Sequence, residues 1–282
     1  MSIQDSDQGR PGGDDTAFLL RPSTASRERP GKVYLVGGGP GDPELLTVRG
    51  ARLIGCADAL VYDHLVGKGI LELARADAAM HYVGKEAGAH TLPQEDINLL
   101  LVRLAQRGLQ VVRLKGGDPF IFGRGGEEIE ELVKHHIPFE VVPGVTAASG
   151  MSAYAGIPLT HRDFAQSCIF TTGHLKDGSC NLDWPVLARP NQTVVIYMGV
   201  GGLGEISRKL QEHGMDAHTP AAVVQYATLP QQRTVVGSIA SLPALAQAQG
   251  IRPPALIVIG QVVRLHRQLA WFRPREVASQ EI

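Results

Sequence analysis

Three glycine clusters are the strongest chemical signal in the sequence. They cover residues 37–43, 115–126 and 143–148, and each follows a short apolar run rich in β-branched residues. Two of them share a Gly-Asp-Pro element, at Asp42 and at Asp118. Glycine at a strand end lets the backbone approach a ligand closely or adopt a positive φ. Because open parallel sheets bind ligands at the carboxyl ends of their strands, three such clusters favour a binding site over unrelated tight turns.

The first cluster does not fit a phosphate-binding loop. A dinucleotide fingerprint needs G-x-G-x-x-G, and Asp42 stands where the third glycine should be. A helix beginning Asp-Pro would place a carboxylate where a pyrophosphate binds. Neither Gly67-Lys68 nor Gly84-Lys85 continues to the Ser or Thr of a Walker loop. The sequence therefore leaves open a neutral or cationic ligand with a nucleoside part.

An alternation of strands and helices from Lys32 onward must position these clusters. Short apolar runs predict strands at 33–36, 59–62, 111–114 and 139–142. Helices are expected at 43–54, where Asp42 caps and Pro43 takes the first position, and at 94–106 and 126–136. This rhythm predicts a mostly parallel sheet covered on both faces.

The second half predicts a different sheet. Residues 143–160 combine a helix at 145–155 with a Gly-Ile-Pro break, which indicates a hinge. Strands at 167–172, 193–197, 221–225, 234–237 and 255–259, with helices at 203–213 and 242–248, predict a mixed sheet containing one hairpin. We therefore expect an α/β protein of two domains. The expected limits are an N-terminal tail 1–30, an N-terminal domain 31–145, a C-terminal domain 146–272 and a C-terminal tail 273–282.

Composition argues against several classes of protein. The formal net charge is −1 and aromatic residues make up 5%, so we expect neither nucleic acid nor a membrane surface as a partner. The three cysteines have no C-x-x-C spacing, and His161 and His174 have no neighbours at metal-ligand spacing, so we expect no metal site. The first residues lack the apolar core of a signal peptide. We expect a cytoplasmic protein.

Several motifs together resemble one family of enzymes. The segments are GGGPGDPELLTVRGARLI, VYDHLV, VGKEAGAHTLPQEDIN, VVRLKGGDPFIFGRGGEE and PFEVVPGVTAASGMSAYAGIPLTHRD. They are similar to the tetrapyrrole methylase family from about Lys32 to Phe272, and Lys115 to Asp163 most resembles its uroporphyrinogen III C-methyltransferases. The resemblance implies two α/β domains with the active site in the cleft between them, usually in a homodimer. It implies methyl transfer from S-adenosylmethionine to C2 and C7 of uroporphyrinogen III, giving precorrin-2 and S-adenosylhomocysteine.

The resemblance also assigns residues to the site. It implies a proton-acceptor role for Asp63 and a proton-donor role for Lys85. Ala227 stands where relatives often have glycine. The positions implied to bind the methyl donor are Pro40, Gly116, Gly117, Asp118, Ile121, Thr146, Ala147, Met198 and Ala227.

Arginines are the natural partners of a substrate with eight carboxylates, because the guanidinium pairs a carboxylate bidentately. Arg124 lies in a glycine-rich turn and Arg162 lies in the break between the two units, so both are expected to face the cleft. Glu127 follows Arg124 by three residues and is expected to orient it. Arg124 is also a rival group for proton transfer, although its pKa above about 12 makes a neutral guanidine costly.

Three alternatives stay open at this point. A related methyltransferase acting on a precorrin shares the same motifs. A nucleotide-binding oxidoreductase is disfavoured by Asp42 in place of glycine. A non-catalytic ligand-binding protein is disfavoured by the combination of Asp63, Lys85 and Arg124.

Overall fold

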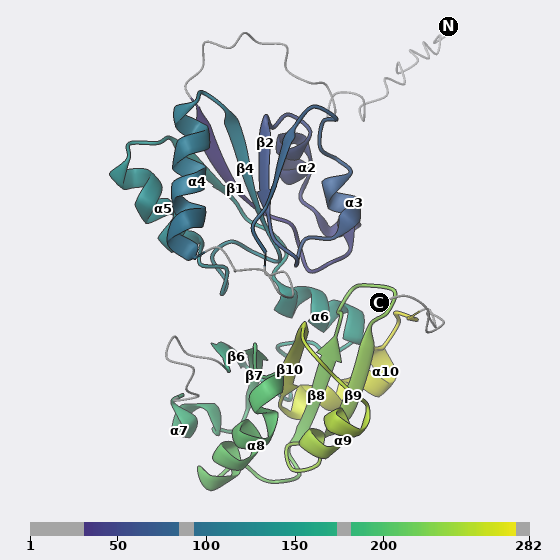
Figure 1. Ribbon diagram of the computed structural model, residues 1–282. Coiled ribbons are helices and arrows are strands. Elements are labelled where there is room, and N and C mark those ends of the chain that lie inside the picture. Colours follow the sequence, from purple (N-terminus) through teal and green to yellow (C-terminus); the bar gives the residue numbers. More distant parts are fainter. Residues whose placement is uncertain (1–30, 85–92, 174–181, 275–282) are drawn as a thin grey trace, which may run out of the picture.

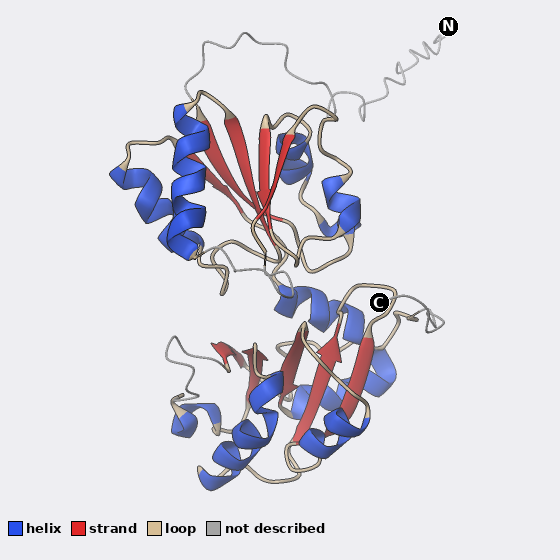
Figure 2. Cartoon of the chain, in the orientation of Figure 1, coloured by secondary structure: helices blue, strands red, loops and turns tan. Residues whose placement is uncertain are grey.

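The computed structural model describes residues 31–84, 93–173 and 182–274. It contains two five-stranded sheets, one from each half of the chain, with helix α6 (Ala147–Ala155) lying between them (Figure 1). Both sheets carry helices on their faces (Figure 2). The predicted α/β class is confirmed.

The first sheet is parallel throughout, as predicted. Its strand order is β3-β2-β4-β1-β5, and all four strand pairs run parallel. The edge strand β3 was not predicted, because its sequence AMHY is largely exposed and has no apolar run. The strands are β1 (Lys32–Gly37), β2 (Ala59–Tyr62), β3 (Ala79–Tyr82), β4 (Gln110–Lys115) and β5 (Phe139–Val142).

Each face of this sheet buries its own core. On one face α4 (Gln94–Gln106) and α5 (Gly125–Lys134) pack Leu101 and Leu132 against Leu35. On the other, residues of α2 (Val48–Ile54) and α3 (Lys68–Leu71) pack against Val36, Leu60 and Val112. Alternate strand residues serve the two faces, as the pleat requires.

The first helical segment differs from the prediction of one helix from Pro43. Asp42 caps only a short 3₁₀ helix, η1 (Pro43–Leu45), by accepting a hydrogen bond from the Glu44 N–H at 2.9 Å. The chain becomes extended again at Leu46 and Thr47. The Thr47 hydroxyl then caps α2 through the Gly50 N–H at 3.0 Å. The second cap therefore interrupts the expected helix, because a threonine side chain competes for the backbone donors that would continue it.

The second sheet is mixed, as predicted. Its order is β6-β7-β10-β8-β9, and only the β6–β7 pair is parallel. The predicted hairpin is confirmed by the antiparallel β8–β9 pair. The strands are β6 (Ser167–Thr172), β7 (Gln192–Tyr197), β8 (Pro220–Gln225), β9 (Arg233–Ser238) and β10 (Ala255–Ile259).

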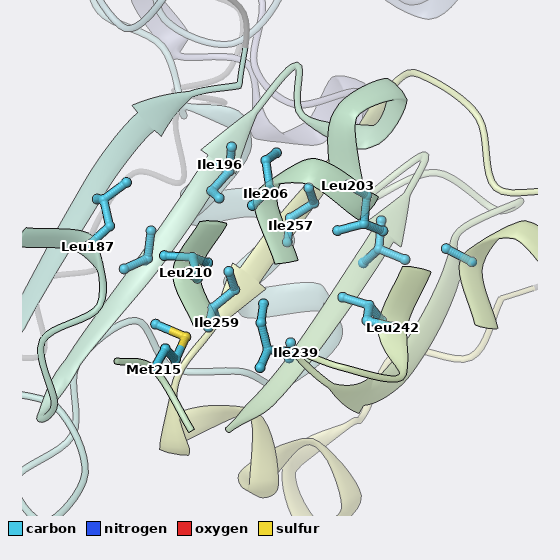
Figure 3. Packing of buried hydrophobic residues seen from close by; sticks show 14 of the residues in the cluster. Leu187, Ile196, Leu203, Ile206, Leu210, Met215, Ile239, Leu242, Ile257 and Ile259 are labelled. Atoms are coloured by element: carbon cyan, nitrogen blue, oxygen red, sulfur yellow. The ribbon is translucent and has the colours of Figure 1, made fainter. Parts of the chain in front are cut away.

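Two apolar layers also cover this sheet. One contains α7 (Trp184–Leu187), α8 (Leu203–Glu212) and α9 (Leu242–Ala248), where Leu210 and Leu242 pack with Ile257 (Figure 3). The other layer contains residues of α6 and η3 (Gln261–Leu265), among them the fully buried Met151, and the short α10 (His266–Leu269) follows η3. A further short turn, η2 (Val200–Gly202), precedes α8. Within the described ranges, no helix has the length and apolar character needed to cross a membrane.

Candidate functional site

The three glycine clusters meet at the carboxyl end of the first sheet. Gly39 and Gly117 form a two-way backbone bridge, with N···O distances of 3.2 and 2.7 Å. The Asp118 carboxylate accepts a hydrogen bond from the Gly144 N–H at 3.0 Å and so joins the second cluster to the third. The expectation that these clusters converge on one place is therefore confirmed.

Some of these glycines serve backbone packing rather than a ligand. A Cβ atom on Gly37 would lie 2.6 Å from the Gly117 oxygen, and one on Gly144 would lie 2.3 Å from it. Gly117 itself has a positive φ of 67°, and its Cβ direction meets the Ala147 nitrogen only at 3.5 Å. A side chain at Gly117 would thus enter the space between the β4 loop and the start of α6.

Strained backbone conformations concentrate in the loops that face the junction of the two sheets. Seven described non-glycine residues have a positive φ, and five of them follow β4, β7 or β8. Such conformations cost about 1–3 kcal/mol each and cluster at functional sites. Nothing in the sequence predicts these conformations, because these residue types do not favour the left-handed region. They are Phe122 (53°), Arg124 (58°), Met198 (54°), Tyr226 (50°) and Thr228 (71°).

The positions implied to bind the methyl donor all lie in the loops around this junction or at the start of α6. Pro40 packs against α6, where a Cβ on Gly150 would meet its ring at 2.5 Å. Thr146 precedes α6, which begins at Ala147, and Met198 follows β7 and is 56% exposed. Four of the positions lie after β4, namely Gly116, Gly117, Asp118 and Ile121, and Ala227 lies after β8.

Tyr197, which the sequence analysis missed, organises the start of α6. Its hydroxyl accepts a hydrogen bond from the Ala148 N–H at 3.0 Å and lies 2.7 Å from Thr146 Oγ1. Burial raises the pKa of the Tyr197 hydroxyl, so the group stays neutral in its contact with Thr146. Its ring contacts that of Phe122, with centroids 4.6 Å apart. A loop of the first half of the chain and a strand of the second therefore touch at this point.

Both Gly-Asp-Pro carboxylates hold loops in place. Asp118 accepts hydrogen bonds from the Phe120 and Gly144 N–H groups at 2.8 and 3.0 Å. Asp42 accepts from the Glu44 N–H and, at 2.6 Å, from the Tyr154 hydroxyl. Both carboxylates are thus held by hydrogen-bond donors of the protein, and the role of Asp118 in binding the methyl donor stays a prediction.

Asp63 lies at the end of β2 with 22% of its side chain exposed. One carboxylate oxygen accepts a hydrogen bond from the Leu65 N–H at 3.0 Å. The other lies 3.4 Å from the guanidinium of Arg113, which is buried. The candidate proton acceptor is therefore oriented from both sides. Lys85, the implied proton donor, lies outside the described residues.

A buried charge cluster made of Arg113, Lys115 and Glu128 lies behind Asp63. Glu128 is fully buried, and its Oε1 accepts from Arg113 Nε at 3.0 Å and from Lys115 Nζ at 2.9 Å. Burial and the neighbouring Arg113 lower the pKa of Lys115, while Glu128 opposes that lowering. The sequence signal was present: two cations occupy alternate positions, and hence one face, of an otherwise apolar strand.

The predicted contact between Arg124 and Glu127 is present. Arg124 Nε and Nη2 donate to the two Glu127 carboxylate oxygens at 2.9 and 2.6 Å, and this pairing raises the pKa of Arg124. Both side chains are about half exposed. Arg162 is exposed in the turn after α6. In the described segments, no group of three or more His, Cys, Asp or Glu side chains could hold a metal ion, and His174 lies outside those segments.

Comparison with known proteins shows what the chain is similar to. A siroheme synthase from Methylobacillus flagellatus is 65% identical over 250 residues, which are 88% of this chain and 54% of that protein. The chain spans about half the length of the curated relatives it matches. The native structure of a uroporphyrin III C-methyl transferase from Thermus thermophilus is 44% identical, with a TM-score of 0.72, and covers 83% of this chain and 100% of its own. A structure of that transferase complexed with S-adenyl homocysteine is 43% identical, with the same TM-score and the same shares covered.

A family model decides the classification. The model described as Tetrapyrrole (Corrin/Porphyrin) Methylases matches residues 32–243, a range that contains both sheets except β10. The chain belongs to the tetrapyrrole methylase family.

Proposed function

We propose that this chain transfers methyl groups from S-adenosylmethionine to C2 and C7 of uroporphyrinogen III and so forms precorrin-2. The observation that carries the proposal is the convergence of the three glycine clusters at the carboxyl end of the first sheet, beside the start of α6. The similarity to a transferase of known structure complexed with S-adenyl homocysteine supports the same donor.

The residues at the junction fit a sulfonium donor. Exposed apolar side chains surround the loops, namely Leu65, Phe120, Phe122 and Met198, and they can cover an adenosine or a methionine chain. None of the nine positions implied to bind the methyl donor is a lysine or an arginine, which suits a cationic ligand. When bound, S-adenosylmethionine supplies a methyl group carried on a positively charged sulfur.

Arg124 and Arg162 supply the carboxylate-binding groups in this proposal. Glu127 holds the Arg124 guanidinium by two hydrogen bonds, which restricts its side chain before a substrate binds. Both arginines are exposed and can therefore reach an acidic substrate at the surface of the junction. Positioning of two reactants in this way can contribute up to about 7–11 kcal/mol to a rate enhancement.

Asp63 accepts the proton that leaves the methylated ring in this proposal, and Lys85 donates one. The Leu65 N–H and the Arg113 guanidinium orient the Asp63 carboxylate, so that its position does not depend on the substrate. Arg124 is a poor base, because pairing with Glu127 raises its pKa further.

A methyl-transfer assay tests the proposed function. The protein is incubated without oxygen with uroporphyrinogen III and methyl-labelled S-adenosylmethionine, and the product mass is measured. We expect a gain of two methyl groups. No gain with this substrate, together with a gain on a precorrin, would assign the chain to the related methyltransferases. Binding of NADH in place of S-adenosylhomocysteine would favour an oxidoreductase.

We also propose a cytoplasmic homodimer built from domains at 31–145 and 146–272. The domain limits are supported by the two sheets, whose strands occupy residues 32–142 and 167–259. The homodimer is supported by family membership. Sedimentation equilibrium of the purified chain tests it, and a monomer at micromolar concentration would contradict it.

A further inference from the structure

Asp42, Tyr154, Thr228 and Gln232 form a closed ring of hydrogen bonds across the junction of the two sheets, which we call the junction ring. Tyr154 donates its hydroxyl to the Asp42 carboxylate at 2.6 Å, and the Asp42 N–H donates to Thr228 Oγ1 at 3.0 Å. The Thr228 N–H donates to Gln232 Oε1 at 2.8 Å. Gln232 Nε2 closes the ring by donating to the Tyr154 carbonyl at 3.3 Å.

The junction ring ties three distant segments together. Asp42 lies in the first glycine cluster, Tyr154 near the end of α6, and the other two members in the β8–β9 connection. Thr228 and Gln232 are 2% and 4% exposed, so water does not compete strongly for their hydrogen bonds. Thr228 also keeps a left-handed backbone with φ of 71°, a costly conformation that surrounding contacts must maintain.

The Tyr154 side chain is held in place independently of Asp42. Its ring contacts those of Trp271 and Phe272, with centroids 5.0 and 4.9 Å away. Trp271 Nε1 also donates to the Ala153 carbonyl at 2.9 Å. The hydrogen bond to Asp42, helped by burial, raises the pKa of Tyr154 to about 12, so the hydroxyl remains a donor at neutral pH. The aromatic contacts therefore fix the Tyr154 side chain, and its hydroxyl in turn restrains the first glycine cluster through Asp42.

The first glycine cluster, which Tyr154 restrains, contains one of the positions implied to bind the methyl donor. Pro40 lies two residues before Asp42 and packs on Gly150 of α6, one turn before Tyr154. At the other end of the same helix, Ala147 lies beside Gly117. Helix α6 thus contacts both the first and the second glycine cluster. The Tyr154 hydroxyl is the polar contact between the C-terminal end of α6 and the first cluster.

We propose that Tyr154 is a positioning residue that holds the first glycine cluster in the conformation that binds the methyl donor. This inference rests on the proposed function. Loss of the hydroxyl lowers the fraction of molecules in which that cluster is held, and the apparent Kd rises in inverse proportion to that fraction. The bond to a charged carboxylate is strong enough for about a tenfold effect.

The test is the affinity for S-adenosylhomocysteine, measured by calorimetry on the full chain. For Tyr154→Phe we expect a Kd about tenfold higher and a raised KM for the methyl donor, with kcat at saturation near that of the wild type. Tyr34→Phe is the matched control, because it removes a hydroxyl hydrogen bond on β1 at 3.4 Å from Gln110, outside the junction ring. Thr228→Val removes another bond of the ring and should also raise the Kd.

A double-mutant cycle separates positioning from general destabilisation. In an Asp42→Ala background, Tyr154→Phe should raise the Kd no further, because its partner is already absent. Asp42→Asn should retain most of the affinity, since an amide still pairs with the hydroxyl. An unchanged Kd for Tyr154→Phe, even with a lower melting temperature, would overturn the inference while leaving the proposed function intact. A wild-type chain that binds no S-adenosylhomocysteine would overturn both.

Discussion

Glu128 is the residue whose substitution tests the buried charge cluster most directly. Its carboxylate is fully buried and bonds Arg113 and Lys115 at 3.0 and 2.9 Å. Glu128→Gln keeps the shape of the side chain but leaves two buried cations without their shared counter-charge. Removing one partner of a buried ion pair costs about 3–5 kcal/mol. We expect about 3 kcal/mol here, the lower end of that range, because both cations bond the same oxygen, Oε1, which the amide retains, and Asp63 stays 3.4 Å from Arg113.

The matched control is the preceding residue. Glu127→Gln also removes a carboxylate bonded to an arginine, but both side chains are about half exposed. Exposed pairs contribute about 1 kcal/mol or less. Urea unfolding of the two variants and the wild type at pH 7 measures both effects. Equal losses of unfolding free energy for the two variants would refute the reasoning that burial makes the Glu128 contacts costly to break.

The pH dependence of this loss identifies its source. Burial and Arg113 lower the pKa of Lys115 in the folded protein, and Glu128→Gln removes the carboxylate that opposes this lowering. The unfolded chain keeps a lysine pKa near about 10.4, so between the two values the unfolded state binds more protons and stability rises with pH. The deficit of Glu128→Gln relative to the wild type should therefore shrink as the pH is raised from 7 toward 10. A deficit independent of pH would mean that the charge of Lys115 does not contribute.

Three further substitutions test the site. Gly117→Ala should weaken S-adenosylhomocysteine binding. Gly108 also has a positive φ, but its Cβ direction meets no atom within 4 Å, so Gly108→Ala should only lower stability, by about 1–2 kcal/mol. Equal affinities of the two variants for S-adenosylhomocysteine would refute a role for Gly117 in binding. Asp63→Asn should lower kcat by about 10²–10⁴ with an unchanged Kd for S-adenosylhomocysteine, and an unaltered rate would remove Asp63 as the proton acceptor. Arg124→Ala should raise the KM for the tetrapyrrole about tenfold or more and spare donor binding, since a bond between charged groups is lost; equal loss of both would contradict its assignment to the substrate.

Local patterns in the sequence were sufficient for most of the architecture. The apolar runs around Val33, Val111 and Val223 predicted strands, and the spacing between them predicted a parallel sheet followed by a mixed one. These predictions succeeded because hydrophobic periodicity reports which face of an element is buried. The prediction of one helix from Pro43 was wrong, because the Thr47 hydroxyl takes the Gly50 N–H that would continue the helix, and the apolar pattern does not reveal this second cap. The motif resemblance gave the family and the list of site residues.

The sequence by itself therefore determined the elements, the glycine clusters at their ends and the family. Only the tertiary structure showed that Arg113, Lys115 and Glu128 share a buried site, and that Asp42 meets Tyr154 at a sequence separation of 112 residues. The left-handed backbones of Met198 and Thr228 were equally invisible, since neither residue type favours that region. The physical reason is that periodicity and capping act within a few residues, whereas these contacts form only where the packing of two sheets brings distant loops together.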